Sequence, residues 1–110
     1  MKHEWPIETL DAPSPNEIIR ILREARAIVA EGWCKGVAED GQGNHCALGA
    51  LALAAPRERV IKTIIPILNK ALPKSFSFGT IACYNDSLST TQADILALFD
   101  RAIEITNDRR

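Results

Sequence analysis

The first strong pattern of hydrophobic positions begins near residue 15. Between residues 15 and 31 apolar side chains recur every three or four positions, which is the spacing of one face of an α-helix. Ser14 can cap such a helix, Pro15 suits its first position, and Glu17 would complete a capping box. Gly32 would end the helix in the left-handed conformation. The pattern therefore predicts a helix over about 15–31.

The last part of the chain carries the clearest helical pattern. Thr91 and Asp94 form a capping signature at its start. The apolar stripe that follows consists of Ile95, Leu98, Phe99, Ala102 and Ile105. We predict a helix over about 91–107.

A short segment in the middle of the chain is apolar on every side. Residues 45–55 carry leucines among alanines, and an all-apolar helix is typical of a buried core helix. Asn44 is the expected cap of this helix. Gly49 and Ala50 would let a neighbouring backbone approach closely. This segment is predicted to lie at the centre of the fold, with the first and last helices packed against it.

The next segment is helical in spacing but contains a proline. Residues 57–72 predict one kinked helix or two short helices, because Pro66 removes a backbone hydrogen bond. Pro73 stops the pattern. Phe76 and Phe78 alternate with serine, which is a weak strand signal, and a turn of helix leading into a loop is the alternative for the residues that follow.

Residues 33–44 separate the first two helices and form a small hairpin or a loop, with a turn at Asp40 and its following glycine. The predicted fold class is mainly α: a compact bundle of four to five helices around a buried central helix, with at most one small β-hairpin. We expect an extended N-terminal arm (1–13), a single helical domain (14–107) and a flexible C-terminus (108–110).

Composition places the chain among ordinary globular domains. It has 110 residues, of which 46% are hydrophobic and 25% charged, and its formal net charge is −1. Its start lacks a signal-peptide pattern, and its longest apolar run is far shorter than the ~20 residues of a membrane helix. We expect a cytoplasmic protein without membrane contact or cofactor, present as a monomer or homodimer.

Three cysteines raise the question of thiol chemistry. Cys46 would lie at the start of the middle helix, where the helix dipole favours a thiolate, and His45 and Asp86 are the candidate partners of a catalytic set. Cys34, Cys46, Cys83 and His45 are the only plausible zinc ligands, but their spacing is not that of known zinc motifs. A disulfide between Cys34 and Cys46 is a further alternative. We interpret the cysteines as packing residues and commit to no catalytic or metal site.

Two groups of residues are candidates for binding. A basic segment over 57–74 is opposed only by Glu58 and could contact phosphates, although the interpretation we favour is a solvated face. Its cations are Arg57, Arg59, Lys62, Lys70 and Lys74. Trp33 and Tyr84 could pack together, and Asn85 and Asp86 beside them could line a small pocket or form a turn.

Several short motifs occur in a fixed order along the chain: "WCKG", "CALGAL", "IACYND" and "TQADILALFDRAI". In these motifs and their order, residues 18–105 resemble a family of small bacterial and phage-borne proteins known only as a domain of unknown function. Tyr84 stands where that family usually has tryptophan, and the loop between Cys34 and Cys46 is short. The resemblance implies a shared fold and no particular activity.

The favoured hypothesis is a non-enzymatic protein-interaction module. The chain is small, lacks a convincing catalytic set and resembles a family found in phage, and on these grounds we expect an accessory or anti-defence role in a phage or mobile element. The alternatives are a thiol-dependent hydrolase or transferase that uses Cys46, and nucleic-acid binding through the basic segment 57–74.

Overall fold

The computed structural model describes residues 12–76 and 79–109, and these residues are mostly helical. The elements are α2 (Pro15–Glu31), α3 (Ala47–Ala54), α4 (Glu58–Lys70), the 3-10 turn η1 (Lys74–Phe76), α5 (Ile81–Asp86) and α6 (Gln92–Asp108). No strand occurs in the described ranges. The predicted mainly-α bundle of four to five helices is confirmed. The predicted N-terminal arm, 1–13, falls outside the described residues except for its last two positions.

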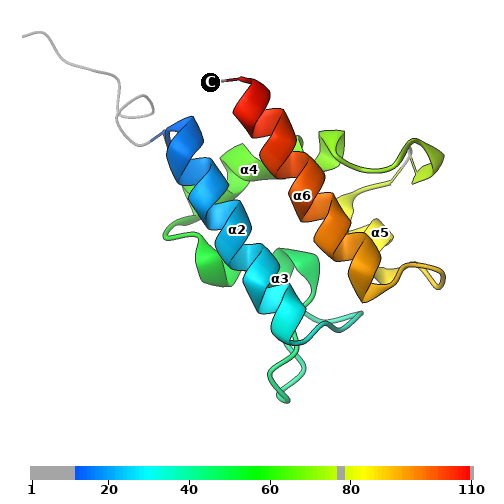
Figure 1. Ribbon diagram of the computed structural model, residues 1–110. Helices are drawn as coiled ribbons and strands as arrows, with labels where there is room; N and C mark the ends of the chain where they lie inside the picture. The colour runs from blue at the N-terminus through cyan, green and yellow to red at the C-terminus, as the bar shows by residue number, and fades with distance from the viewer. Residues whose placement is uncertain (1–11, 77–78, 110) are drawn as a thin grey trace, which may run out of the picture.

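Two long antiparallel helices form one layer of the molecule. Figure 1 shows α2 and α6 side by side, running in opposite directions. Arg26 of α2 and Asp100 of α6 form a bidentate ion pair, with N–O distances of 2.7 and 3.2 Å. Near the C-terminus of α2, Gln92 Nε2 of α6 donates a hydrogen bond to the carbonyl of Val29, 2.7 Å away. This bond satisfies one of the free carbonyls at the C-terminus of α2.

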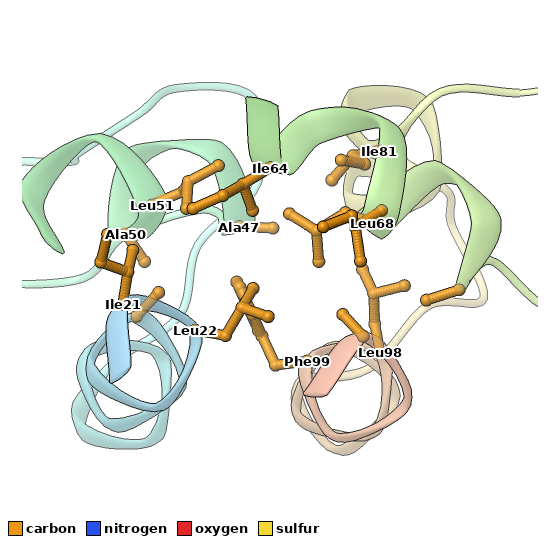
Figure 2. Packing of buried hydrophobic residues seen from close by; sticks show 14 of the residues in the cluster. Ile21, Leu22, Ala47, Ala50, Leu51, Ile64, Leu68, Ile81, Leu98 and Phe99 are labelled. Atoms are coloured by element: carbon orange, nitrogen blue, oxygen red, sulfur yellow. The ribbon is translucent and has the colours of Figure 1, made fainter. Parts of the chain in front are cut away.

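The shorter helices α3, α4 and α5 form the second layer. α3 packs against α2, as predicted, and α4 packs against α6. The prediction that the last helix also packs against α3 is wrong, because α6 contacts α3 at most slightly and packs on α2 and α4 instead. Figure 2 shows Leu22 of α2 and Phe99 of α6 pointing from their layer toward Ala47 and Leu68 of the other. All four side chains are fully buried. The core therefore lies between the two layers, and no helix of the described chain is long and apolar enough to cross a membrane.

Both ends of α2 depend on local chemistry. Ser14 caps the helix by accepting a hydrogen bond from the amide of Glu17, and Pro15 occupies its first position, as predicted. The prediction for Gly32 is wrong, because its φ of −178° is extended backbone and not left-handed. A Cβ on Gly32 would overlap the side chain of Asn44, so a larger residue there would require that side chain to move.

The start of α3 also differs from the prediction. Its cap is Cys46, whose Sγ accepts from the amide of Gly49 at 3.2 Å. Asn44 is not the cap, because its side-chain amide donates to Asp40 Oδ2 within the preceding loop. Gly49 does permit a close approach as predicted: a Cβ there would overlap the carbonyl oxygen of Ala38.

The proline-containing segment is one continuous helix. Pro66 lies inside α4 on its exposed side. Because proline has no backbone N–H, one carbonyl in the preceding turn lacks its helical hydrogen bond, and water can reach that carbonyl on the exposed side. Ile64, Ile67 and Leu68 anchor the opposite side in the core. The strand signal at Phe76 is wrong, since this residue ends a 3-10 turn, and Phe78 lies outside the described residues.

The loop between α2 and α3 is held by a few bridges and not by a hairpin. His45 pairs with Trp33 in parallel and with Glu39 in antiparallel fashion, as isolated bridges. The carbonyl of Ala38 accepts from the amide of Cys46 at 3.1 Å. Asp40 Oδ1 accepts from the amide of Gln42, which forms the predicted turn. The loop is thus folded back against the N-terminus of α3.

Candidate interaction surface

Asn85, in the last turn of α5, is a buried polar hub with 1% of its surface exposed. Its Oδ1 accepts from Trp33 Nε1 at 2.7 Å and from the amide of Ala47 at 3.0 Å. Its Nδ2 donates to the carbonyl of Cys34 at 3.1 Å and to Asp86 Oδ1 at 3.0 Å. We call this arrangement the Asn85 junction. It joins α5, the start of α3 and the loop, and it uses both the donors and the acceptor of the amide.

The charged residues beside the junction are also engaged within the chain. Asp86 Oδ1 accepts from the amide of Gly36 at 2.9 Å. The hydrogen bond from Asn85, followed by that from Gly36, lowers the pKa of the Asp86 carboxyl. Lys35 Nζ donates to the carbonyl of Ser87 at 2.6 Å. These groups hold the loop against α5 and leave little capacity for a ligand.

Two of the three candidate catalytic residues border one hollow, but His45 does not join them. Cys46 and Asp86 border an open hollow of about 250 Å³, whereas His45 borders a different hollow. Cys46 Sγ is already used as the cap of α3, and Asp86 is bonded to the loop. His45 Nδ1 is buried without a hydrogen-bond partner. The arrangement thus does not supply His45 as a base for the Cys46 thiol.

The three cysteines are free thiols with different surroundings. Cys34 is half-buried, and burial followed by the nearby charge of Asp40 raises the pKa of its thiol. Cys83 is exposed, and hydrogen bonds with Thr80 lower the pKa of its thiol. Interpreting every cysteine as a packing residue is therefore wrong for Cys83. In the described part of the chain no group of three or more histidine, cysteine or acidic side chains could hold a metal ion.

The aromatic candidates serve the interior. Tyr84 is 8% exposed and packs against Phe76, with ring centroids 5.2 Å apart at 57°. Trp33 instead bonds to Asn85, and the ammonium of Lys35 lies 5.3 Å from the centroid of its ring. The predicted pairing of Trp33 with Tyr84 is replaced by these contacts, which serve the fold.

The basic segment is exposed, and acidic side chains of α4 and α6 lie beside several of its cations. Lys62 Nζ lies 3.8 Å from a carboxylate oxygen of Glu58 on the same helix. Lys70 and Lys74 border a hollow of about 440 Å³ together with Arg101, Glu104 and Asp108. The five predicted cations, Arg57, Arg59, Lys62, Lys70 and Lys74, all lie on the surface along α4 and just beyond its ends. No uninterrupted basic stripe results, which weakens the phosphate-binding interpretation.

The outer side of α3 presents an unexpected apolar surface. Leu53 is 64% exposed and lies where two hollows meet, of about 440 and 300 Å³. The first is lined by Ala38, Glu39, His45, Gly49, Ala52 and Leu53, and the second by Glu24, Ala27, Ile28, Glu31 and Leu53. We call this combined surface the Leu53 face. Sequence reasoning missed it, because the segment 45–55 was expected to be buried all round.

Comparison with known protein families gives a clear assignment. Residues 13–105 match the family of unknown function DUF6197, and the chain belongs to this family. Comparison with curated proteins and with solved structures found no match. The match confirms the expected resemblance to a family of unknown function and leaves the activity open.

Proposed function

We propose that this chain is a non-enzymatic protein-interaction module that binds another protein through the Leu53 face. The observation that carries the proposal is the exposure of Leu53. Eight apolar or small residues form α3, yet Leu53 and Ala52 point away from the core. Leu53 is joined in the linings of the two hollows by Ala27, Ile28, Ala38 and Ala52, and a contiguous apolar surface marks a contact site, whereas scattered single side chains are ordinary.

The Asn85 junction differs from the Leu53 face, because its side chains are already engaged within the chain. Its polar side chains bond to one another and to the backbone, so their role in the fold accounts for them. The candidate base for thiol catalysis, His45, borders a different hollow from Cys46 and Asp86. Leu53, by contrast, buries little of its side chain in the core, and exposed apolar surface of this kind is typical of sites that bind another protein.

Finer features of the proposal come from the sequence. We propose that the protein is cytoplasmic and is a monomer or a homodimer. An accessory or anti-defence role in a phage or mobile element is the version that the resemblance to bacterial and phage-borne proteins favours.

The proposal is tested by affinity capture from cells that naturally carry the protein. The full chain, Leu53→Ser and Leu88→Ser serve as baits. Leu88 is a matched control because it is a fully exposed leucine in the turn after α5. We expect the same protein to be enriched by the full chain and by Leu88→Ser, and lost with Leu53→Ser. The absence of any enriched protein, or its retention by Leu53→Ser, would refute the proposal.

A further inference from the structure

The charges around Leu53 indicate what kind of partner fits. We propose that the Leu53 face binds a basic amphipathic helix, in which an apolar stripe is flanked by lysine or arginine. This inference rests on the proposed function and adds the chemistry of the bound segment to it.

The charge on the Leu53 face has a single sign. Its lining contains three carboxylates, Glu24, Glu31 and Glu39, and neither lysine nor arginine. Glu24 has a distant contact with Arg20, at 3.9 Å between two exposed groups. Within the described residues, Glu31 and Glu39 have no ion-pair partner. The carboxylates are therefore available to a cationic partner at little cost.

The carboxylates lie on both sides of the apolar centre. Glu24 and Glu31 border the hollow on the α2 side of Leu53, and Glu39 borders the hollow on the loop side. An amphipathic helix presents apolar side chains in one stripe and long cationic side chains at its edges. Laid over Leu53, its apolar side chains would enter the two hollows and its cations would reach the flanking carboxylates.

The same charges disfavour other occupants. A second copy that used the same face in a two-fold dimer would place these carboxylates opposite their own equivalents. Nucleic acid and anionic lipid are repelled for the same reason. Complementary charge raises the association rate and rejects acidic partners, so a basic segment fits this surface best.

The first experiment identifies the segment in contact. A photo-crosslinking amino acid replaces Leu53 in the full chain, and in a matched control it replaces Leu88. After irradiation in cells that carry the protein, the cross-linked peptides are sequenced by mass spectrometry. We expect cross-links specific to position 53, to a segment with apolar residues three or four apart and flanking lysine or arginine. A neutral or acidic segment, a second copy of this chain, nucleic acid, lipid or no cross-link would overturn the inference.

The second experiment tests the carboxylates directly. The cross-linked segment, made as a labelled peptide, is titrated with the full chain and with the double variant Glu31→Lys, Glu39→Lys. We expect at least a tenfold loss of affinity in the double variant and weaker binding of the unsubstituted chain at high salt. Glu104→Lys, on the exposed side of α6, is the matched control and should bind within twofold of the unsubstituted chain. Equal affinity of the double variant and the control would overturn the inference.

The two proposals fail in different ways. Loss of capture with Leu53→Ser, together with unchanged binding after charge reversal, leaves the interaction module and removes the basic partner. Retention of capture with Leu53→Ser removes both.

Lysine at position 31 is compatible with the end of α2, because cations are favoured near a helix C-terminus.

Discussion

At the start of α3, the amide of Ala47 and the indole of Trp33 share the buried oxygen of Asn85. A few residues further along the same helix, Leu53 is 64% exposed beside two hollows. The first region consists of polar groups that have found partners inside the chain. The second is centred on an apolar side chain that has no such partner, with carboxylates at its edges. The comparison separates residues that the fold requires from residues that it leaves available.

The Asn85 junction also shows why polarity alone is a poor guide to function. Asn85 and Asp86 are the kind of residues that suggest a binding pocket in a sequence. In the fold they organise the loop, because Asn85 pairs with the indole of Trp33 and with backbone groups of Cys34 and Ala47, and Asp86 accepts from the amide of Gly36. Their polar groups therefore serve the fold.

The largest expected effect comes from breaking the junction. Asn85→Ala would leave Trp33 Nε1, the amide of Ala47 and the carbonyl of Cys34 without their partner. A buried unpaired group costs about 1–3 kcal/mol, and two of these three hydrogen bonds are only part-buried, so we expect the free energy of unfolding to fall by about 3–5 kcal/mol, in the lower half of the summed range. Urea denaturation measures it. Asn69→Ala, at an exposed position of α4, is the control, and a fall of less than about 1 kcal/mol for Asn85→Ala would contradict the assignment.

The close contact beneath the loop should be the next most sensitive feature. Gly49→Ala would improve helix propensity by about 1 kcal/mol, but its Cβ would overlap the carbonyl oxygen of Ala38. We expect the overlap to dominate, with a net loss of about 1–3 kcal/mol in thermal or urea unfolding. Gly36→Ala is the comparison, because space is open there and only the φ of +85° opposes a side chain. Stabilisation by Gly49→Ala would show that the loop does not pack as described.

Thiol reactivity should differ between the junction and the open surface. Burial and the charge of Asp40 raise the pKa of Cys34, whereas hydrogen bonds with Thr80 lower the pKa of exposed Cys83. A lowered pKa means more thiolate at a given pH, so Cys83 should react with iodoacetamide at least about ten times faster than Cys34 at pH 7.5. Peptide mapping after short exposures gives both rates. Equal rates in the folded protein, with equal rates in urea as reference, would contradict the environments assigned here.

Local signals account for the parts of the fold that the sequence predicts well. The capping box of Thr91 and Asp94 at the start of α6, and the Ser14 cap of α2, each act within three residues. The sequence pattern therefore predicts nearly the whole of both helices. The start of α3 is not, because Asn44 bonds to Asp40 in the folded loop and leaves the cap to Cys46.

The candidate site was harder to predict because its determinants are far apart in the chain. Asn85 reaches Trp33 across 52 positions, and a sequence offers only a turn signal for it. The exposure of Leu53 depends on which sides of α3 the other helices cover, and periodicity is silent when every position is apolar.

The smallest expected effect on stability tests the other half of the comparison. Leu53→Ser should lower the free energy of unfolding by no more than about 1 kcal/mol, because most of the side chain is already in water. Leu51→Ala, two residues away and fully buried, should cost about 2.7–5 kcal/mol. Urea denaturation of both variants gives the ratio. If Leu53→Ser proved as costly as Leu51→Ala, Leu53 would belong to the core, and any loss of partner binding in that variant would reflect unfolding and not a lost contact.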